Sequence, residues 1–184
     1  VLVTGADAPV RDIAGLIALA RARPGEVSYG SVGNGSPHHL AMAMLARMAG
    51  VEMTHVPYRG SSLSVPDVLA GNVASVMGEI STVFPLWRDG RLRVLATSGA
   101  QRTVLMPDVP TLVEQGHARL VVREWFGFFM PGRTPAAAID AASSALRTAL
   151  AQPALVAAFA DAGMTAVSST PAAMAARIAS EQRN

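Results

Sequence analysis

The chain has 184 residues, about half of them hydrophobic, which suffices for one large domain or two small ones with a buried core. It has no cysteine, so disulfides, zinc–thiolate sites, iron–sulfur clusters and cysteine nucleophiles are excluded. The net charge is +2, and the 15 basic residues are scattered arginines without interleaved aromatic residues, which argues against nucleic acid as a partner. No apolar run approaches the roughly 20 residues that a membrane helix needs.

The first half of the chain alternates short apolar runs with amphipathic segments. Residues 1–5 lack the basic and apolar segments of a signal peptide, so we expect a cytoplasmic protein or a processed or truncated exported one. Hydrophobic spacing and cap residues predict helices over residues 12–23, 36–50, 65–70 and 82–88. The runs between them predict strands over residues 27–30, 53–56, 73–77 and 93–97. This alternation predicts an α/β fold with a mainly parallel sheet.

The pattern changes after Gln101. A proline-rich loop over residues 106–111 leads into a short predicted helix that ends near Gly116. Residues 120–130 form a long extended run that holds most of the aromatic side chains. Further helices are predicted over residues 135–150 and 153–162 and from residue 171 onward, with a short strand over residues 165–167. The break near residues 118–130 indicates a crossover between two lobes.

The first candidate binding site is a Gly/Ser-rich loop between the strand at 27–30 and the helix that follows it. The loop holds Ser31, Gly33, Gly35 and Ser36, and His39 follows in the first helical turn. Small residues let a ligand approach the backbone, and the unpaired amides of a helix start attract carboxylate or phosphate. A tight turn with a capping serine is the alternative. The glycine order does not fit a dinucleotide-binding fingerprint, and the loop has no lysine, which excludes a P-loop.

A second candidate loop follows the strand at 53–56. Tyr58 offers a ring and a hydroxyl, and Gly60 and Ser61 offer backbone and hydroxyl donors near a helix start. Arg59 would be able to pair with an anion, although a solvated arginine is the simpler interpretation. Glu79 follows a third strand, where it either faces a cleft or is a solvated acid before a helix.

Catalytic and metal-binding patterns are weak. His38 and His39 are adjacent and point in different directions on a helix, and no metal-ligand spacing occurs, so neither a metal nor a cofactor is expected. We expect the His39 ring to hydrogen-bond nearby backbone. A hydrolase that uses Ser31 or Ser36 with His39 is an alternative, but no convincing acid–base pair or triad accompanies these residues. We therefore expect no enzyme.

Five motifs occur in the same order as in a known family. They are Tyr29-Gly30-Ser31 with Gly33-x-Gly35-Ser36-x-x-His39-Leu40, then residues 55–60, 107–111, 125–135 and 163–171. Together they resemble the Bug-type solute-binding proteins of tripartite tricarboxylate transporters. The resemblance implies a periplasmic receptor with the two-lobed type II periplasmic-binding (Venus flytrap) fold. It also implies a small carboxylate or amino acid as ligand and membrane permease subunits as partners; a sensor module for a signalling protein is the alternative.

The same resemblance implies how the chain is divided. Residues 1–122 would form the second lobe, and residues 123–184 would be a crossover strand and the C-terminal helices of the first lobe. Most of the first lobe, with its own glycine-rich ligand loop, would lie outside this sequence. Family members often have an aspartate where Gly78 stands. The ligand contacts expected here are Ser31, Gly33, Gly35, Ser36, His39, Tyr58, Gly60 and Ser61.

Overall fold

The structure, a computed structural model, describes residues 1–181 and divides the chain into two compact units, Val1–Glu124 and Trp125–Asn184. Each unit is described by itself. The boundary expected after residue 122 lies close to this division. The assignment of the two segments to particular lobes stays a prediction.

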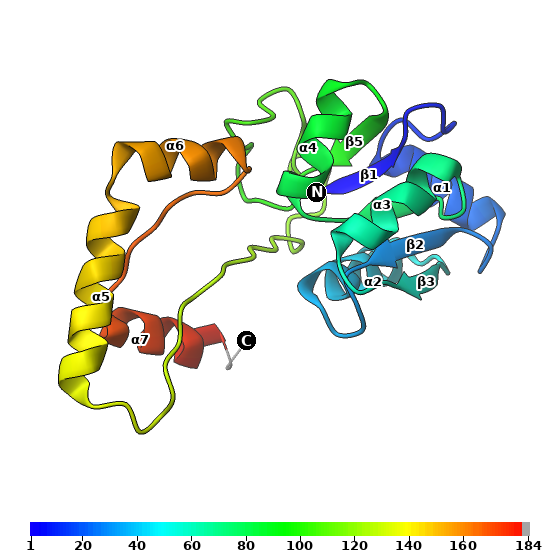
Figure 1. Cartoon of the computed structure of the whole chain (residues 1–184). Coiled ribbons are helices and arrows are strands. Elements are labelled where there is room, and N and C mark those ends of the chain that lie inside the picture. The colour runs from blue at the N-terminus through cyan, green and yellow to red at the C-terminus, as the bar shows by residue number, and fades with distance from the viewer. Residues whose placement is uncertain (182–184) are drawn as a thin grey trace. The chain divides into compact units, whose positions relative to one another are not determined.

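The first unit contains one five-stranded sheet (Figure 1). Its strands are β1 (Leu2–Gly5), β2 (Ser28–Ser31), β3 (Thr54–Pro57), β4 (Ser75–Met77) and β5 (Leu92–Ala96), in the order β3-β2-β4-β1-β5. β2 pairs in parallel with β3 and β4, whereas β1 pairs antiparallel with β4 and β5. Four strands therefore run in one direction, as expected for a mainly parallel sheet, and β1 runs opposite to them. The residue pattern did not predict β1, whose pairing depends on segments that are distant in the sequence.

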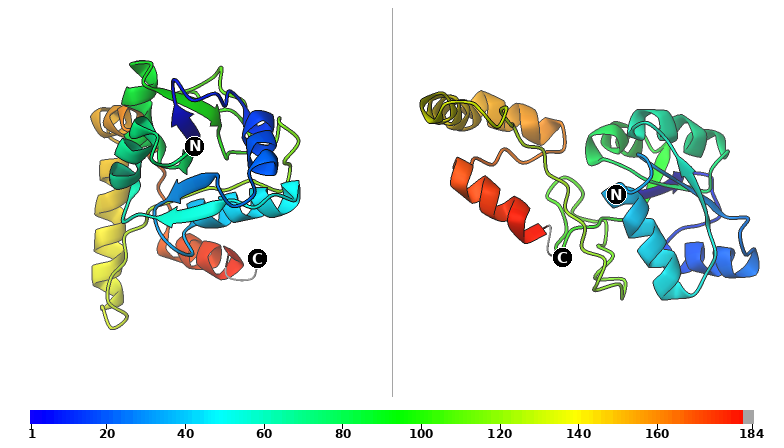
Figure 2. Two further views of the ribbon diagram at one scale, coloured as in Figure 1. Left: turned by 90° about the vertical axis from the view of Figure 1, so that its right-hand side faces the viewer. Right: turned by 90° about the horizontal axis from the view of Figure 1, so that it is seen from below.

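Four helices cover the two faces of this sheet (Figures 1 and 2). They are α1 (Ile13–Ala22), α2 (Pro37–Ala49), α3 (Ser61–Ala70) and α4 (Ile80–Arg88). α1 and α2 pack on one face, where their apolar residues share a cluster, and α3 and α4 pack on the other. Local signals fix their ends: Asp12 caps α1 by accepting from the Gly15 amide at 2.7 Å, and Gly50 ends α2 in the left-handed conformation.

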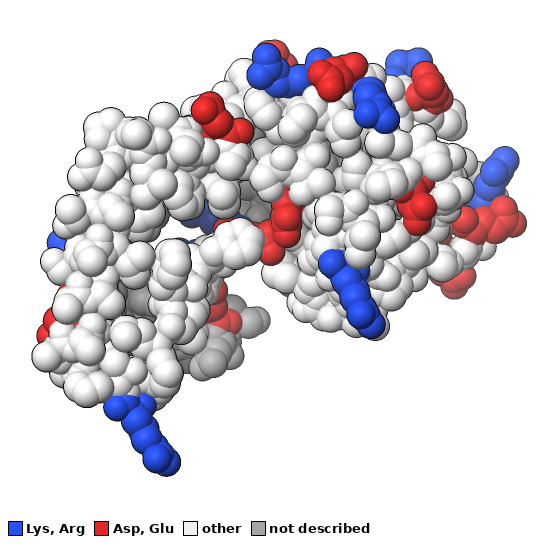
Figure 3. All heavy atoms as spheres, in the orientation of Figure 1, with Lys and Arg blue, Asp and Glu red and all other residues white. Residues whose placement is uncertain are grey.

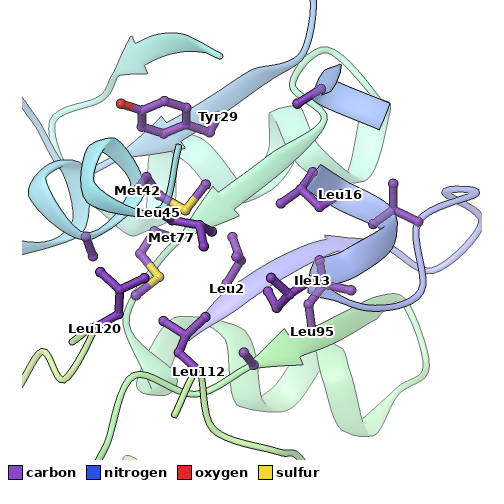
Figure 4. Packing of buried hydrophobic residues seen from close by; sticks show 14 of the residues in the cluster. Leu2, Ile13, Leu16, Tyr29, Met42, Leu45, Met77, Leu95, Leu112 and Leu120 are labelled. Atoms are coloured by element: carbon purple, nitrogen blue, oxygen red, sulfur yellow. The ribbon is translucent and has the colours of Figure 1, made fainter. Parts of the chain in front are cut away.

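The larger core cluster joins elements that are distant in sequence (Figure 4). Leu2 from β1 and Met77 from β4 join Leu16 from α1 and Leu45 from α2 in one cluster, on the face of the sheet that these helices cover. Each of these side chains is almost fully buried, and burying one such side chain contributes about 1.5–3 kcal/mol. The cluster therefore stabilises the sheet from whose strand ends the candidate loops emerge.

Two predicted elements of the first unit differ from the structure. α3 begins at Ser61 rather than near residue 65, and in its first turn the buried Ser64 hydroxyl donates to the Ser61 carbonyl at 3.0 Å. The short helix expected before Gly116 is a set of turns. Thr111 and Glu114 form a reciprocal capping pair there, but the Gly116 and His117 amides bond back and close the segment at once.

The second unit is helical in its described part. Its helices are α5 (Ala136–Leu150), α6 (Pro153–Asp161) and α7 (Pro171–Glu181), close to their predicted ranges. The strand predicted over residues 165–167 is wrong, because the described residues of this unit contain no partner strand and Val167 is 70 % exposed. The run over residues 120–130 likewise forms no strand. Much of the visible surface of this unit is uncharged (Figure 3).

No described side chain of the second unit is buried. Phe126, Phe128 and Phe129 are all largely exposed. Trp125 is tied to α7, because its indole nitrogen donates to Glu181 at 2.8 Å and Arg177 lies over its ring. Across residues 1–181, no helix combines the length and the apolar character needed to cross a membrane.

Candidate functional site

The loops after β2 and β3 meet at one edge of the sheet. Because β2 and β3 are parallel neighbours, their carboxyl ends lie side by side. The Tyr58 amide donates to the Ser31 carbonyl at 2.9 Å, which extends the strand pairing into the loops. The helices α2 and α3 begin at this edge, so their unpaired amides and positive dipole ends face the same region. The structure thus brings the two predicted loops together.

The loop after β4 joins them through Ser61. The hydroxyl of Ser61 is buried and accepts a hydrogen bond from the Glu79 amide at 3.1 Å. A side chain added at Gly78 would meet the same hydroxyl at 3.4 Å. Ser61 therefore connects the loops after β3 and β4 through the acceptor side of its hydroxyl. Glu79 is half-buried beside it, while Arg59 is exposed and forms no ion pair with the described residues.

Ser31 lies at the floor of the β2–α2 loop and is 0 % exposed. Its Oγ accepts from the Gly33 amide at 3.2 Å and lies 2.7 Å from Nε2 of His55 on β3. Gly33 has φ +134°, a conformation that favours glycine. The serine hydroxyl thus holds the first bend of the loop in place from beneath.

Ser36 and His39 hold the other end of the loop. The Ser36 Oγ accepts from the His39 amide at 3.2 Å, as an N-cap does, and donates to the Gly33 carbonyl at 2.7 Å. The Nδ1 of His39 accepts from the Gly35 amide at 3.1 Å. This confirms the expectation that the His39 ring bonds nearby backbone.

Tyr58 is directed toward α3. Its hydroxyl donates to Oδ2 of Asp67 at 2.6 Å, and its ring packs against Gly30. Burial, aided by the hydrogen bond to Asp67, raises the pKa of the Tyr58 hydroxyl to about 12. Tyr58 therefore supplies the β3–α3 loop with a packed ring, and its hydroxyl is engaged by the helix. Gly60 precedes α3 with φ 121°.

Sequence reasoning missed the part played by His55. The parallel register pairs Tyr29 with His55, and their rings stack at a centroid distance of 5.0 Å. His39 also stacks with His55, at a centroid distance of 4.0 Å. Burial, and then the neighbouring His39 ring, lower the pKa of the His55 imidazole. The signal was the position of His55 at the end of a strand, but its partner was set only by the β2–β3 pairing.

His38, in contrast, points away from this ring stack. It is buried, and its Nε2 lies 3.7 Å from Glu124. Burial lowers the pKa of His38 to about 4. His38 and His39 thus lie in separate environments, as expected for adjacent residues of a helix.

The serine and histidine side chains of the site make structural contacts. The Ser31 hydroxyl contacts His55, not His39, and it is too deeply buried to attack a substrate. In the described part of the chain no carboxylate lies within ion-pair distance of His39 or His55, and no three potential ligands gather for a metal ion. Helix-start amides around small residues form a surface that attracts anions.

Comparison with known proteins gives a consistent result. The family described as the tripartite tricarboxylate transporter family receptor matches residues 1–184. A protein from the tcbD–tcbE intergenic region of Pseudomonas sp. strain P51 is 36 % identical over 182 residues, which cover 98 % of this chain and 54 % of that protein. BugT of Bordetella pertussis is 35 % identical over 171 residues, which cover 93 % of this chain and 52 % of BugT.

Solved structures agree with this match. An R. palustris protein solved with adipate superposes with a TM-score of 0.92 at 29 % identity, covering 98 % of this chain and 60 % of that one. A periplasmic transporter gives a TM-score of 0.91 at 28 % identity with the same coverage. The predicted α/β periplasmic-binding fold of Venus-flytrap type, with one lobe complete and the other partial, is thereby confirmed. The chain spans about half the length of these curated relatives.

Proposed function

This chain belongs to the tripartite tricarboxylate transporter receptor family, and we propose that it is part of a periplasmic receptor that captures a small carboxylate or related anion. The receptor would deliver this ligand to the membrane permease subunits of a tripartite tricarboxylate-type transporter. It would act by binding alone, without catalysing a reaction. An adipate complex of a protein 29 % identical to this chain supports a carboxylate as the ligand class.

The observation that carries this proposal is the meeting of the β2–α2 and β3–α3 loops at one sheet edge. Two helix starts there offer backbone amides and positive dipole ends without a basic side chain in a fixed ion pair. Such a surface holds a carboxylate by hydrogen bonds.

We propose that the predicted contact residues act in two ways. Gly33, Gly35, Ser36, His39 and Gly60 are exposed or half-buried, and we expect them to face the ligand. Ser31, Tyr58 and Ser61 have hydroxyls engaged by His55, Asp67 and the Glu79 amide. These three are expected to hold the loops in shape, so that their substitution weakens binding through the loop backbone.

The test uses the complete receptor that contains this chain. Its melting temperature would be measured with adipate, succinate, citrate and aspartate, and with the uncharged diamide of adipate as the matched control. A ligand present at about 100 times its Kd stabilises the native state by about 2.7 kcal/mol, so at least one acid should raise the melting temperature clearly. If none of the four acids changes the melting temperature, or if the diamide acts as strongly, the proposal is wrong.

A further inference from the structure

Two amides of the β2–α2 loop are already occupied by side chains of the protein. The Gly33 amide donates to Ser31 Oγ at 3.2 Å, and the Gly35 amide donates to His39 Nδ1 at 3.1 Å. The serine is fully buried, but Gly35 is exposed and His39 is only half-buried. An anion that approaches this loop therefore competes with the His39 imidazole for the Gly35 amide.

The bond from Gly35 depends on the protonation state of His39. The Nδ1 atom accepts a hydrogen bond only while it carries no proton, so the neutral ring must hold its proton on Nε2. A protonated His39 has donors at both nitrogens and loses the bond. Protonation then has two effects at once: it frees the Gly35 amide, and it places a positive charge beside it.

His55 behaves differently when it gains a proton. Its Nε2 lies 2.7 Å from Ser31 Oγ, which accepts from a protonated Nε2 while donating to the Gly33 carbonyl at 3.2 Å. A proton on His55 therefore leaves the loop as it is. Because the two rings stack at 4.0 Å, a charge on one disfavours a charge on the other. A positive charge on His39 therefore disfavours a proton on His55.

The surroundings leave this pair free to respond to a ligand. From β2, the other titratable group that faces the rings is Tyr29, whose pKa is raised by burial so that its phenol stays neutral near pH 7. From α2 and β3, the two imidazoles face each other. Within residues 1–181, neither ring has a carboxylate at ion-pair distance that would hold it in the charged form. An incoming anion would be the first negative partner of the pair.

We propose that His39 and His55 form a proton-linked pair, so that an anionic ligand enters the β2–α2 loop together with one proton, taken up on His39 as it releases the Gly35 amide. The inference rests on the proposed carboxylate-binding function and adds a regulation of the same site. Because linkage is reciprocal, a ligand that raises proton affinity is itself bound more tightly at lower pH. If ligand binding takes up one proton, the Kd falls at most tenfold for each unit by which the pH is lowered.

The experiment measures binding of adipate to the complete receptor by titration calorimetry between about pH 6.5 and pH 8, where adipate stays ionised. If another of the four acids gives the largest thermal shift, that acid is the probe. Repeating the titration in two buffers of different ionisation enthalpy counts the protons taken up, and we expect a value between zero and one that is clearly above zero. The affinity should rise as the pH falls through this range.

Three variants assign the effect. His39→Asn keeps an acceptor for the Gly35 amide but takes no proton, so proton uptake and the pH dependence of Kd should disappear. His55→Gln keeps a partner for Ser31 and removes the second ring, and proton uptake on binding should persist in this variant because His39 remains. His117→Gln removes an imidazole elsewhere in the first unit and should change neither quantity.

The amide resonance of Gly35 gives a readout that needs no ligand. It should move with pH in the parent receptor and in His117→Gln, but not in His39→Asn. Binding without proton uptake would overturn the proton linkage while leaving the proposed function intact, and so would a pH dependence that survives His39→Asn. If no acid of the panel binds at either end of the pH range, the proposed function itself is wrong.

Discussion

At the scale of single residues, Gly30 shows how tightly the site edge is built. A Cβ atom at this position would lie 2.9 Å from Val76 Cγ2 and 3.1 Å from the Tyr58 ring. Glycine is therefore required by its neighbours on β4 and the β3–α3 loop, not by its backbone conformation. The absence of a side chain lets the Tyr58 ring pack against the end of β2.

Substitution Gly30→Ala should lower the free energy of unfolding by about 1–3 kcal/mol, because overpacking forces neighbours out of their preferred positions. Urea unfolding of the purified protein measures this value. Gly132→Ala is the matched control, since nothing lies within 4 Å of a Cβ at that position. Equal effects of the two changes would contradict the packing argument.

At the scale of elements, the start of α2 determines the shape of the first loop. Ser36 uses both properties of its hydroxyl there, accepting from the His39 amide and donating to the Gly33 carbonyl. α3 begins without such a bond, because Gly60 precedes it. The two helix starts at the site edge are therefore stabilised differently, one by a side-chain cap and the other by buried serines within the helix.

The change Ser36→Ala should destabilise the protein by about 1 kcal/mol, the usual effect of losing an N-cap. It should also loosen the Gly33 to Gly35 segment, which is measurable as faster amide hydrogen exchange there. Ser62→Ala serves as the control, because Ser62 is exposed in the first turn of α3 and its hydroxyl makes no hydrogen bond with residues 1–181. Unchanged exchange in Ser36→Ala would show that the loop is held by other contacts.

At the scale of the whole molecule, the buried core is confined to one unit. Every buried hydrophobic side chain lies between Val1 and Leu120, and the described residues of the second unit contribute none. Folding a segment without burial leaves its conformational entropy loss uncompensated. The helices of the second unit have the right local signals, yet these signals alone give marginal stability in water.

The two units should therefore behave differently when separated. A fragment of residues 1–124 should unfold cooperatively on heating, whereas a fragment of residues 125–184 should show no cooperative transition. Circular dichroism and dispersion of amide resonances measure both outcomes. A sharp, concentration-independent transition in the 125–184 fragment would contradict the prediction.

The sequence by itself determined most helices and strands, the two loops and the family. Local signals were sufficient for these, such as Ser36-Pro37 at the start of α2 and Gly50 at its end, because caps and glycine stops act over a few residues. The predicted strand over residues 165–167 does not form in the structure. A strand needs a partner strand, and the local sequence does not reveal whether one is present.

Only the tertiary structure decided what surrounds each residue of the site. The register of β2 and β3 places His55 beside Tyr29, at the strand ends where the loops begin. The packing of α3 directs the Tyr58 hydroxyl toward Asp67. The antiparallel β1 and the buried link from Ser61 to Glu79 also depend on contacts between distant segments. Hydrogen bonds and ring stacking depend on the relative positions of residues on different strands and helices. The spacing of residues along one strand or helix does not determine these positions.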